Sequence, residues 1–217
     1  GHYEENDHPQ KICHRSDDHN GQHPSHQAEN GADGGPVAEG NIGGGTGMAL
    51  YGFKGGNGTA SRIIKIDTAT YTVGVFMQAN FGGRNDLLIA GIPVGREIKD
   101  HQAVLNNPKK KDGSVIIIIA TDAPLLPSQL KLVAKRAAMG IARTGSFAHN
   151  GSGDIFLAFS TQSPPNNAKG THQTWNVLTK EALDRVFKAT VEATEESVIN
   201  ALIAAETMKG KNGNTFY

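Results

Sequence analysis

The sequence predicts a layered fold of mixed helices and strands, preceded by a short irregular segment. Residues 1–35 hold six of the nine histidines but only one large aliphatic side chain, Ile12, and cannot bury a core. From residue 36 onward, β-branched runs come first, and then a strand, a helix, a strand and a long helix follow. This order is typical of layered α/β or α+β packing. We therefore expect an irregular segment over 1–35 and a single domain over 36–217.

The composition excludes several classes of protein. The 217 residues carry 21 Lys and Arg against 21 Asp and Glu, so the basic excess that a strong nucleic-acid binder needs is missing. No apolar run approaches the ~20 residues of a membrane-spanning helix, and a single cysteine, Cys13, excludes an internal disulfide. The chain lacks an initiator Met, which predicts that Gly1 is a fragment boundary. The compartment stays open, with a cytoplasmic location favoured.

Two loops are predicted. Residues 39–58 hold nine glycines in twenty positions, which allows positive φ angles and close backbone approach. Because the glycines lack the spacing of a dinucleotide-binding or P-loop motif, close packing or a substrate-lining role is favoured over nucleotide binding. Residues 99–113 are polar and include three lysines in a row, which predicts an exposed loop that a protease can reach.

Five runs are predicted as strands because they are rich in aliphatic, β-branched and aromatic residues. The first three cover residues 61–66, 71–78 and 87–92. The other two, 114–120 (SVIIIIA) and 154–160 (DIFLAFS), are nearly continuous in apolar residues. This pattern predicts buried strands, and the first of the two is expected to be covered on both faces.

Two helices are predicted from apolar residues at helical spacing. The first covers 127–143, with Pro127 in its first turn. The second and longest covers 179–209, with Thr179 as the N-cap and Gly210 at its end.

The histidine-rich start is a poor candidate for a metal site. Its spacing fits no fixed zinc pattern, so adventitious binding or no role is expected. We predict no metal and no other cofactor.

Ser114 is a candidate nucleophile, although its position alone is a weak signal. It stands between an exposed loop and a buried strand, directly after Gly113. Cleavage of the Gly113–Ser114 bond would give Ser114 a free α-amine beside its hydroxyl. With a pKa near ~7.7–8.0, this amine can accept the hydroxyl proton. The small Gly113 leaves room for the N→O acyl shift that self-cleavage requires.

Long ordered motifs run through roughly residues 35–161. The strongest are GSVIIIIATDAPLLPSQLKLVAKRAAMGIARTGS at 113–146 and NGSGDIFLAFST at 150–161, and GPVAEGNIGGGTGM at 35–48 adds to them. They resemble the L-aminopeptidase/D-esterase (DmpA-type) and β-peptidyl aminopeptidase family. The resemblance implies an α+β fold, a four-layer αββα sandwich that is Ntn-hydrolase-like with the connectivity of DmpA and ornithine acetyltransferase. It also implies self-processing into two subunits just before Ser114, homotetramers of the processed heterodimers, and no metal.

By position, the resemblance also assigns roles to individual residues. Asn80 in QANFG matches the asparagine that helps to hold the oxyanion. Ser152 and Asp154 in NGSGD match a polar pair beside the nucleophile: Ser152 would relay or orient the proton, and Asp154 would hold the substrate ammonium. Outside this motif, a turn with a capping aspartate would be the favoured interpretation of the pair. The resemblance places three glycines at the substrate pocket: Gly43, Gly44 and Gly45.

The predicted function is a self-processing N-terminal-serine aminopeptidase, amidase or esterase that releases N-terminal residues from short peptides, amides or esters. Two alternatives stay open. An acyltransferase of the ornithine acetyltransferase type would pass the same acyl group to an amine, although a threonine in place of Ser114 would favour that branch. A catalytically inactive scaffold of the same fold is the second alternative, because most of the family's long N-terminal part is absent before the glycine loop.

Overall fold

The computed structural model describes residues 35–106, 113–162, 171–172 and 174–217. The unit Glu39–Tyr217 is built around a four-stranded sheet in the order β3 (Asn57–Ile66), β4 (Ala69–Asn80), β5 (Ser114–Thr121) and β6 (Ile155–Ser160). β4 pairs antiparallel with both β3 and β5, whereas β5 and β6 are parallel. A parallel pair needs a crossover connection, and α3 (Pro127–Arg143) lies in this one.

The shorter elements surround one end of this sheet. Two-stranded ribbons are formed by β1 (Ala49–Leu50) with β2 (Phe53–Lys54) and by β7 (Met208–Lys209) with β8 (Thr215–Phe216). The remaining short helices are η2 (Gly43–Gly45), η3 (Arg84–Asp86), α2 (Val94–Glu97) and η4 (Lys211–Gly213).

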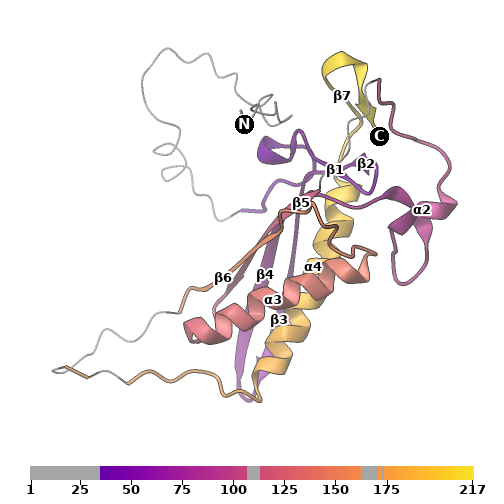
Figure 1. The fold of residues 1–217 in the computed structure, drawn as a ribbon. Helices are drawn as coiled ribbons and strands as arrows, with labels where there is room; N and C mark the ends of the chain where they lie inside the picture. The colour runs from indigo at the N-terminus through magenta and orange to yellow at the C-terminus, as the bar shows by residue number, and fades with distance from the viewer. Residues whose placement is uncertain (1–34, 107–112, 163–170, 173) are drawn as a thin grey trace, which may run out of the picture. The chain divides into compact units, whose positions relative to one another are not determined.

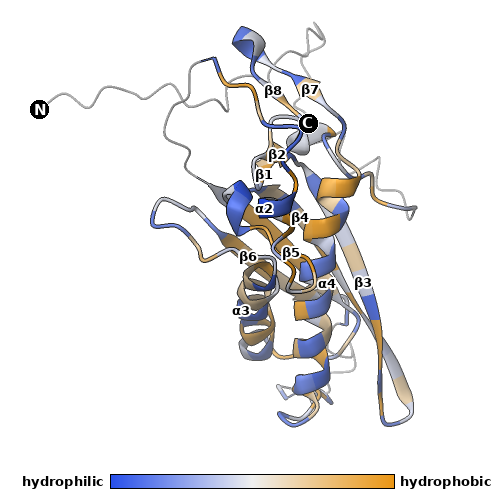
Figure 2. Ribbon diagram, turned by 90° about the vertical axis from the view of Figure 1, so that its right-hand side faces the viewer, coloured by the Kyte–Doolittle hydropathy of each residue, from blue (hydrophilic) through white to orange (hydrophobic). Residues whose placement is uncertain are grey.

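Two helices cover one face of the sheet (Figure 1). α3 packs on β5 and β6, α4 (Leu183–Ile203) packs on β3 and β4, and the two helices also pack against each other. Each helix has a hydrophobic and a hydrophilic side (Figure 2), as expected when one side covers a core. Gly140 lets α3 approach α4, because a Cβ there would lie 2.5 Å from the Thr194 Cβ. Within the described part of the chain, no helix is long and apolar enough to cross a membrane.

On the opposite face of the sheet, the part formed by β5 and β6 is apolar and partly exposed over the described ranges. Along β5, Val115 and Ile117 are buried under the helices, whereas Ile116 between them is 41 % exposed. On β6, Ile155, Leu157 and Phe159 are exposed in the same alternation. The structure therefore differs from the prediction that these strands are buried, because the described residues supply a helical layer on one side only.

Most predicted elements are confirmed. Residues 61–66, 71–78 and 114–120 lie within β3, β4 and β5, β6 begins one residue after 154, and α3 has the predicted bounds 127–143. The predicted exposed loop is largely exposed over 99–106, whereas 107–112 lie outside the described residues. Residues 1–34, with Cys13 and their six histidines, also lie outside them, so the division at 35/36 stays a prediction.

The predicted strand over 87–92 is wrong. Ile89 and Ile92 exchange two backbone hydrogen bonds, each 3.0 Å, across a tight turn. Ala90 and Gly91 occupy the turn with φ angles of 51° and 78°. In this run Leu87 is buried in the core, whereas Ile92 is 58 % exposed, and the segment does not join the four-stranded sheet.

The predicted bounds of the last helix are also wrong. α4 begins at Leu183 after Ala182, so Thr179 is not its N-cap, and it ends at Ile203, well before Gly210. A distant partner competes with further helical turns. The side chain of Asn41 accepts a hydrogen bond from the Glu206 N–H (3.0 Å) and donates one to the Glu206 carbonyl (3.2 Å).

Close packing of β3 on α4 predicts a large effect for one glycine. A Cβ on Gly58 would lie 2.0 Å from the Ser197 carbonyl oxygen, so Gly58→Ala forces α4 away from the sheet. We expect a loss of about 3 kcal/mol in the free energy of unfolding, measured in urea. Gly47→Ala is the matched control, because a Cβ there meets no atom within 4 Å. Equal unfolding midpoints for the two variants would contradict this packing argument.

Candidate active site

Ser114 and Asn80 lie opposite each other at one end of the sheet. Asn80 is the last residue of β4, Ser114 is the first residue of β5, and the two are register partners. Directly opposed residues project to the same face of a sheet. Since the neighbouring Ala79 and Val115 are buried under the helices, Ser114 and Asn80 project to the opposite, open face. Strand pairing thus brings the two predicted residues together.

The orientation of the Asn80 side-chain amide is fixed by a backbone donor. The Ala49 N–H donates to Asn80 Oδ1 at 3.0 Å. Because a backbone N–H can only donate, the oxygen must face Ala49, and the amide NH2 is turned away from it. The described residues offer Nδ2 no hydrogen-bond acceptor. A donor is therefore left on the face of the sheet that Ser114 shares.

Two glycines flank Ser114. A Cβ on Gly113 would lie 3.3 Å from both the Asn80 carbonyl oxygen and the Phe81 Cα, and one on Gly153 would lie 3.9 Å from the Ser114 Cβ. The Gly153 N–H donates to the Gly113 carbonyl oxygen at 3.2 Å. The carbonyl of the bond before Ser114 therefore already has a backbone donor.

Ser152 and Asp154 form a pair just before β6. The Ser152 hydroxyl donates to Asp154 Oδ1 at 2.6 Å, and the Ser152 N–H donates to the His149 carbonyl at 2.8 Å. No hydrogen bond joins either side chain to Ser114 over the ranges that the structure describes. The contact fits both a turn and the predicted polar pair, so the assigned roles of the two residues stay predictions.

The glycine loop approaches the same face of β4. A Cβ on Gly44 would lie 2.3 Å from the Oε1 of Gln78, which precedes Asn80 by two residues. A Cβ on Gly45 would lie 2.5 Å from the Gly40 carbonyl oxygen, whereas one on Gly43 meets nothing within 4 Å. Gly45 is thus required by close backbone packing, whereas at Gly44 the Gln78 side chain could move aside. A substrate-lining role for Gly43, Gly44 and Gly45 stays a prediction.

Sequence reasoning gave no role to Lys54, which belongs to the same glycine-rich segment and lies in β2. Its side chain is 3 % exposed, and its Nζ donates to the carbonyl oxygens of Gly45 (3.3 Å), Met48 and Gly55 (2.8 Å). Desolvation lowers the pKa of Lys54 to about 8. One signal points to it in the sequence, since Lys54 is the only residue over 40–61 with a charged side chain at neutral pH.

Comparison with family models identifies the family of this chain. The family model described as peptidase family S58 matches residues 12–216, which is most of the chain. The chain belongs to peptidase family S58.

Relatives in family S58 support this assignment. The chain is 48 % identical over 193 residues to the β-peptidyl aminopeptidase BapA of Sphingosinicella microcystinivorans, an alignment that covers 83 % of this chain and 49 % of that protein. It is 47 % identical over 202 residues to BapA of Sphingosinicella xenopeptidilytica, covering 88 % of this chain and 50 % of the relative. The chain therefore spans about half the length of the curated relatives that it matches.

The S58 fold is confirmed by a solved structure. The L-aminopeptidase D-Ala-esterase/amidase of Ochrobactrum anthropi is described as a new variant of the Ntn-hydrolase fold. It superposes with a TM-score of 0.76 and 43 % identity, covering 88 % of this chain and 52 % of its own. The predicted α+β, Ntn-hydrolase-like fold is thus confirmed. The described residues contribute one sheet and one helical layer to it.

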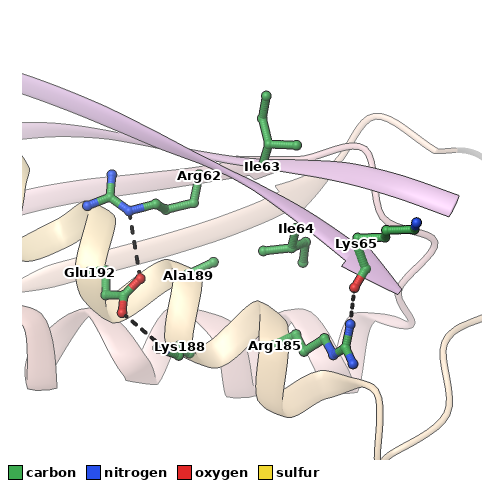
Figure 3. Close-up of a pocket in the computed structure, with 8 residues that line it drawn as sticks. All are labelled: Arg62, Ile63, Ile64, Lys65, Arg185, Lys188, Ala189 and Glu192. Carbon is green, nitrogen blue, oxygen red and sulfur yellow. Dashed lines mark hydrogen bonds and ion pairs between the residues drawn. The ribbon is translucent and has the colours of Figure 1, made fainter. Parts of the chain in front are cut away.

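A pocket between β3 and α4 lies apart from Ser114 and Asn80 (Figure 3). Neither Ser114 nor Asn80 lines it. Three of its charged side chains form ion pairs: Glu192 lies 3.7 Å from both the Arg62 Nε and the Lys188 Nζ. Arg185 donates to the Lys65 carbonyl. These contacts hold the edge strand to the helix.

Proposed function

We propose that this protein is a self-processing N-terminal-serine aminopeptidase, amidase or esterase that acts on short peptides, amides or esters. One observation carries the proposal: Ser114, directly after Gly113, lies opposite Asn80, whose amide oxygen is held by the Ala49 N–H and whose Nδ2 has no acceptor among the described residues. The names of the S58 relatives support the substrate class. The proposed assembly is a tetramer of processed heterodimers in the cytoplasm, and the proposed chemistry uses no metal or other cofactor.

Self-cleavage comes first. The Ser114 Oγ attacks the Gly113 carbonyl carbon, the C–N bond to Ser114 breaks, and the hydroxyl proton moves to the departing nitrogen. Water then hydrolyses the ester, which leaves a Gly113 carboxylate and a Ser114 with both a hydroxyl and a free amine. The Gly153 N–H, 3.2 Å from the Gly113 oxygen, supports this step because it donates where negative charge develops.

Substrate turnover uses the new terminus. The Ser114 amine takes the proton from its own Oγ, which attacks the substrate carbonyl, and the departing amine or alcohol receives that proton. The Asn80 amide stabilises the oxyanion, an interaction worth ~2.7–4 kcal/mol for a single donor. Water then hydrolyses the acyl-enzyme. In this proposal Ser152 orients the proton, Asp154 holds the substrate ammonium, and the pocket is lined by Gly43, Gly44 and Gly45.

Intact-mass measurement of the purified protein tests the proposal. Processing predicts a fragment ending at Gly113 and one beginning at Ser114, and Edman degradation of the latter should read Ser-Val-Ile-Ile. Aminoacyl p-nitroanilides then test hydrolysis. A chain that stays whole and hydrolyses none of them supports the inactive scaffold instead. Transfer of an acetyl group to an amino acid without peptide hydrolysis supports the acyltransferase.

The proposed base predicts how activity depends on pH. The Ser114 amine accepts a proton only when it is neutral, and an α-amine has a pKa near ~7.7–8.0. We expect kcat/KM for an aminoacyl p-nitroanilide to fall about tenfold for each pH unit below this pKa. The pH profile of an ester with the same acyl group serves as the control for the leaving group. A flat profile between pH 5 and pH 8 would contradict an amine base.

A further inference from the structure

The buried ammonium group of Lys54 donates to backbone carbonyls, an arrangement that apolar packing does not require. It lies in β2, directly opposite Ala49 of β1. Its ammonium group meets three backbone carbonyls, those of Gly45, Met48 and Gly55, and makes no ion pair with a described carboxylate. Burying a lysine cation costs free energy unless polar groups replace its water. Here the three carbonyl oxygens replace the water.

One of these carbonyls belongs to the peptide group that holds Asn80. The C=O of Met48 and the N–H of Ala49 are two ends of a single planar peptide unit. Lys54 donates to the oxygen end, and the nitrogen end donates to Asn80 Oδ1 at 3.0 Å. A cation at the oxygen end polarises the peptide and strengthens the N–H as a donor. The chain of contacts therefore runs from the ammonium, through one peptide unit, to the Asn80 amide.

The rest of the loop alone would hold this peptide less firmly. The Met48 oxygen also accepts a hydrogen bond from the Gly55 N–H at 3.3 Å, and the Met48 N–H donates to the Gly45 oxygen at 3.1 Å. Both contacts are between residues of a glycine-rich segment with high conformational freedom. Among the described residues, only Lys54 joins Gly45, Met48 and Gly55 through one atom.

We propose that Lys54 is a positioning residue of the active site: its buried ammonium fixes the Met48–Ala49 peptide, and this peptide holds the Asn80 amide with its NH2 directed to the oxyanion. The catalytic part of the inference rests on the proposed function. The structural part, the hold on Ala49 and Asn80, does not. At neutral pH most Lys54 side chains carry the charge, because their pKa of about 8 lies above that pH.

The structural part is tested by amide hydrogen exchange, followed by NMR on the purified ¹⁵N-labelled protein. In the wild type the Ala49 N–H should exchange at least tenfold more slowly than the Gly47 N–H, relative to their intrinsic rates, because no described residue accepts from Gly47. Lys54→Met should remove this protection at Ala49 while β3 and β4 stay protected. Lys131→Met, an exposed lysine on α3, is the matched control and should change neither.

The catalytic part is tested with the same variants by steady-state kinetics. Lys54→Met should lower kcat at least tenfold with less than threefold change in KM, and should add little to the loss caused by Asn80→Ala, since both act through one amide. Lys54→Gln, which keeps a neutral donor, should fall between Lys54→Met and the wild type, and it replaces Lys54→Met if that variant does not fold.

Three outcomes would overturn the inference. One is a wild-type Ala49 N–H that exchanges as fast as Gly47. The second is a folded Lys54 variant that keeps Ala49 protected. The third is a Lys54 variant with full kcat in an active enzyme. A protein that does not turn over substrate, yet loses Ala49 protection in Lys54→Met, would refute the proposed function and leave the structural part standing.

Discussion

Replacing Ser114 with alanine is expected to leave a single uncut chain and to lower hydrolysis of aminoacyl p-nitroanilides by at least about 10³-fold. The variant loses the Oγ that attacks the Gly113 carbonyl, and without cleavage no free amine forms at residue 114. One substitution therefore removes the nucleophile and the base together. Intact mass measures the first effect, and initial rates measure the second.

The control for this prediction is a nucleophile of nearly the same size. Ser114→Cys keeps an attacking atom and should still be cut. Thermal unfolding of processed Ser114→Cys should be nearly that of the processed wild type, since Ser114 is not part of the buried core. Cleavage of Ser114→Ala at the same bond would show that another group attacks Gly113.

Replacing Asn80 with alanine is expected to lower kcat by about 10²–10³-fold, the range for loss of a single oxyanion donor. The effect should fall on kcat more than on KM, because the donor is needed where charge develops in the transition state. It is measured with a series of aminoacyl p-nitroanilides on processed enzyme, in which Ser114 already has its free amine.

Asn80→Asp removes the NH2 donor but keeps the oxygen that accepts from the Ala49 N–H. Aspartate still accepts the hydrogen bond from the Ala49 N–H, so the loop should keep its place and the protein its stability. It has no NH2, and its negative charge repels an oxyanion. We expect it to be at least as inactive as Asn80→Ala. Activity within threefold of the wild type would assign oxyanion stabilisation to backbone groups instead.

Ser114 and Asn80 lie on the exposed face of the sheet, so whatever covers that face also encloses them. Ser114 and Asn80 open onto the same face as Ile116, Ile155 and Leu157, which are exposed over the described ranges. A four-layer sandwich places a second sheet against such a face. Since the chain spans about half the length of its curated relatives, the activity of the whole protein stays a proposal that the experiments above address.

Much of the fold could be predicted from local sequence. The β-branched runs within β3, β4 and β5 can be predicted as strands from their composition. α3 begins at Pro127 because proline suits a first helical turn. The segment over 87–92 shows the limit of such reasoning. Its apolar composition predicts a strand, but Leu87 is buried just before a tight turn at Ala90 and Gly91, and Ile92 is exposed.

The sequence by itself determined the strands and α3, the nucleophile candidate Ser114 after its glycine, and the motifs of the family. Only the tertiary structure decided where α4 ends, that Asn80 is paired with Ser114, and that Lys54 contacts the peptide group that donates to Asn80. The physical reason is the separation along the chain of the residues that interact. Strand and helix patterns depend on neighbours within a few positions, whereas the Asn41–Glu206 contacts, the β4–β5 register and the burial of an ammonium group depend on residues that only folding brings together.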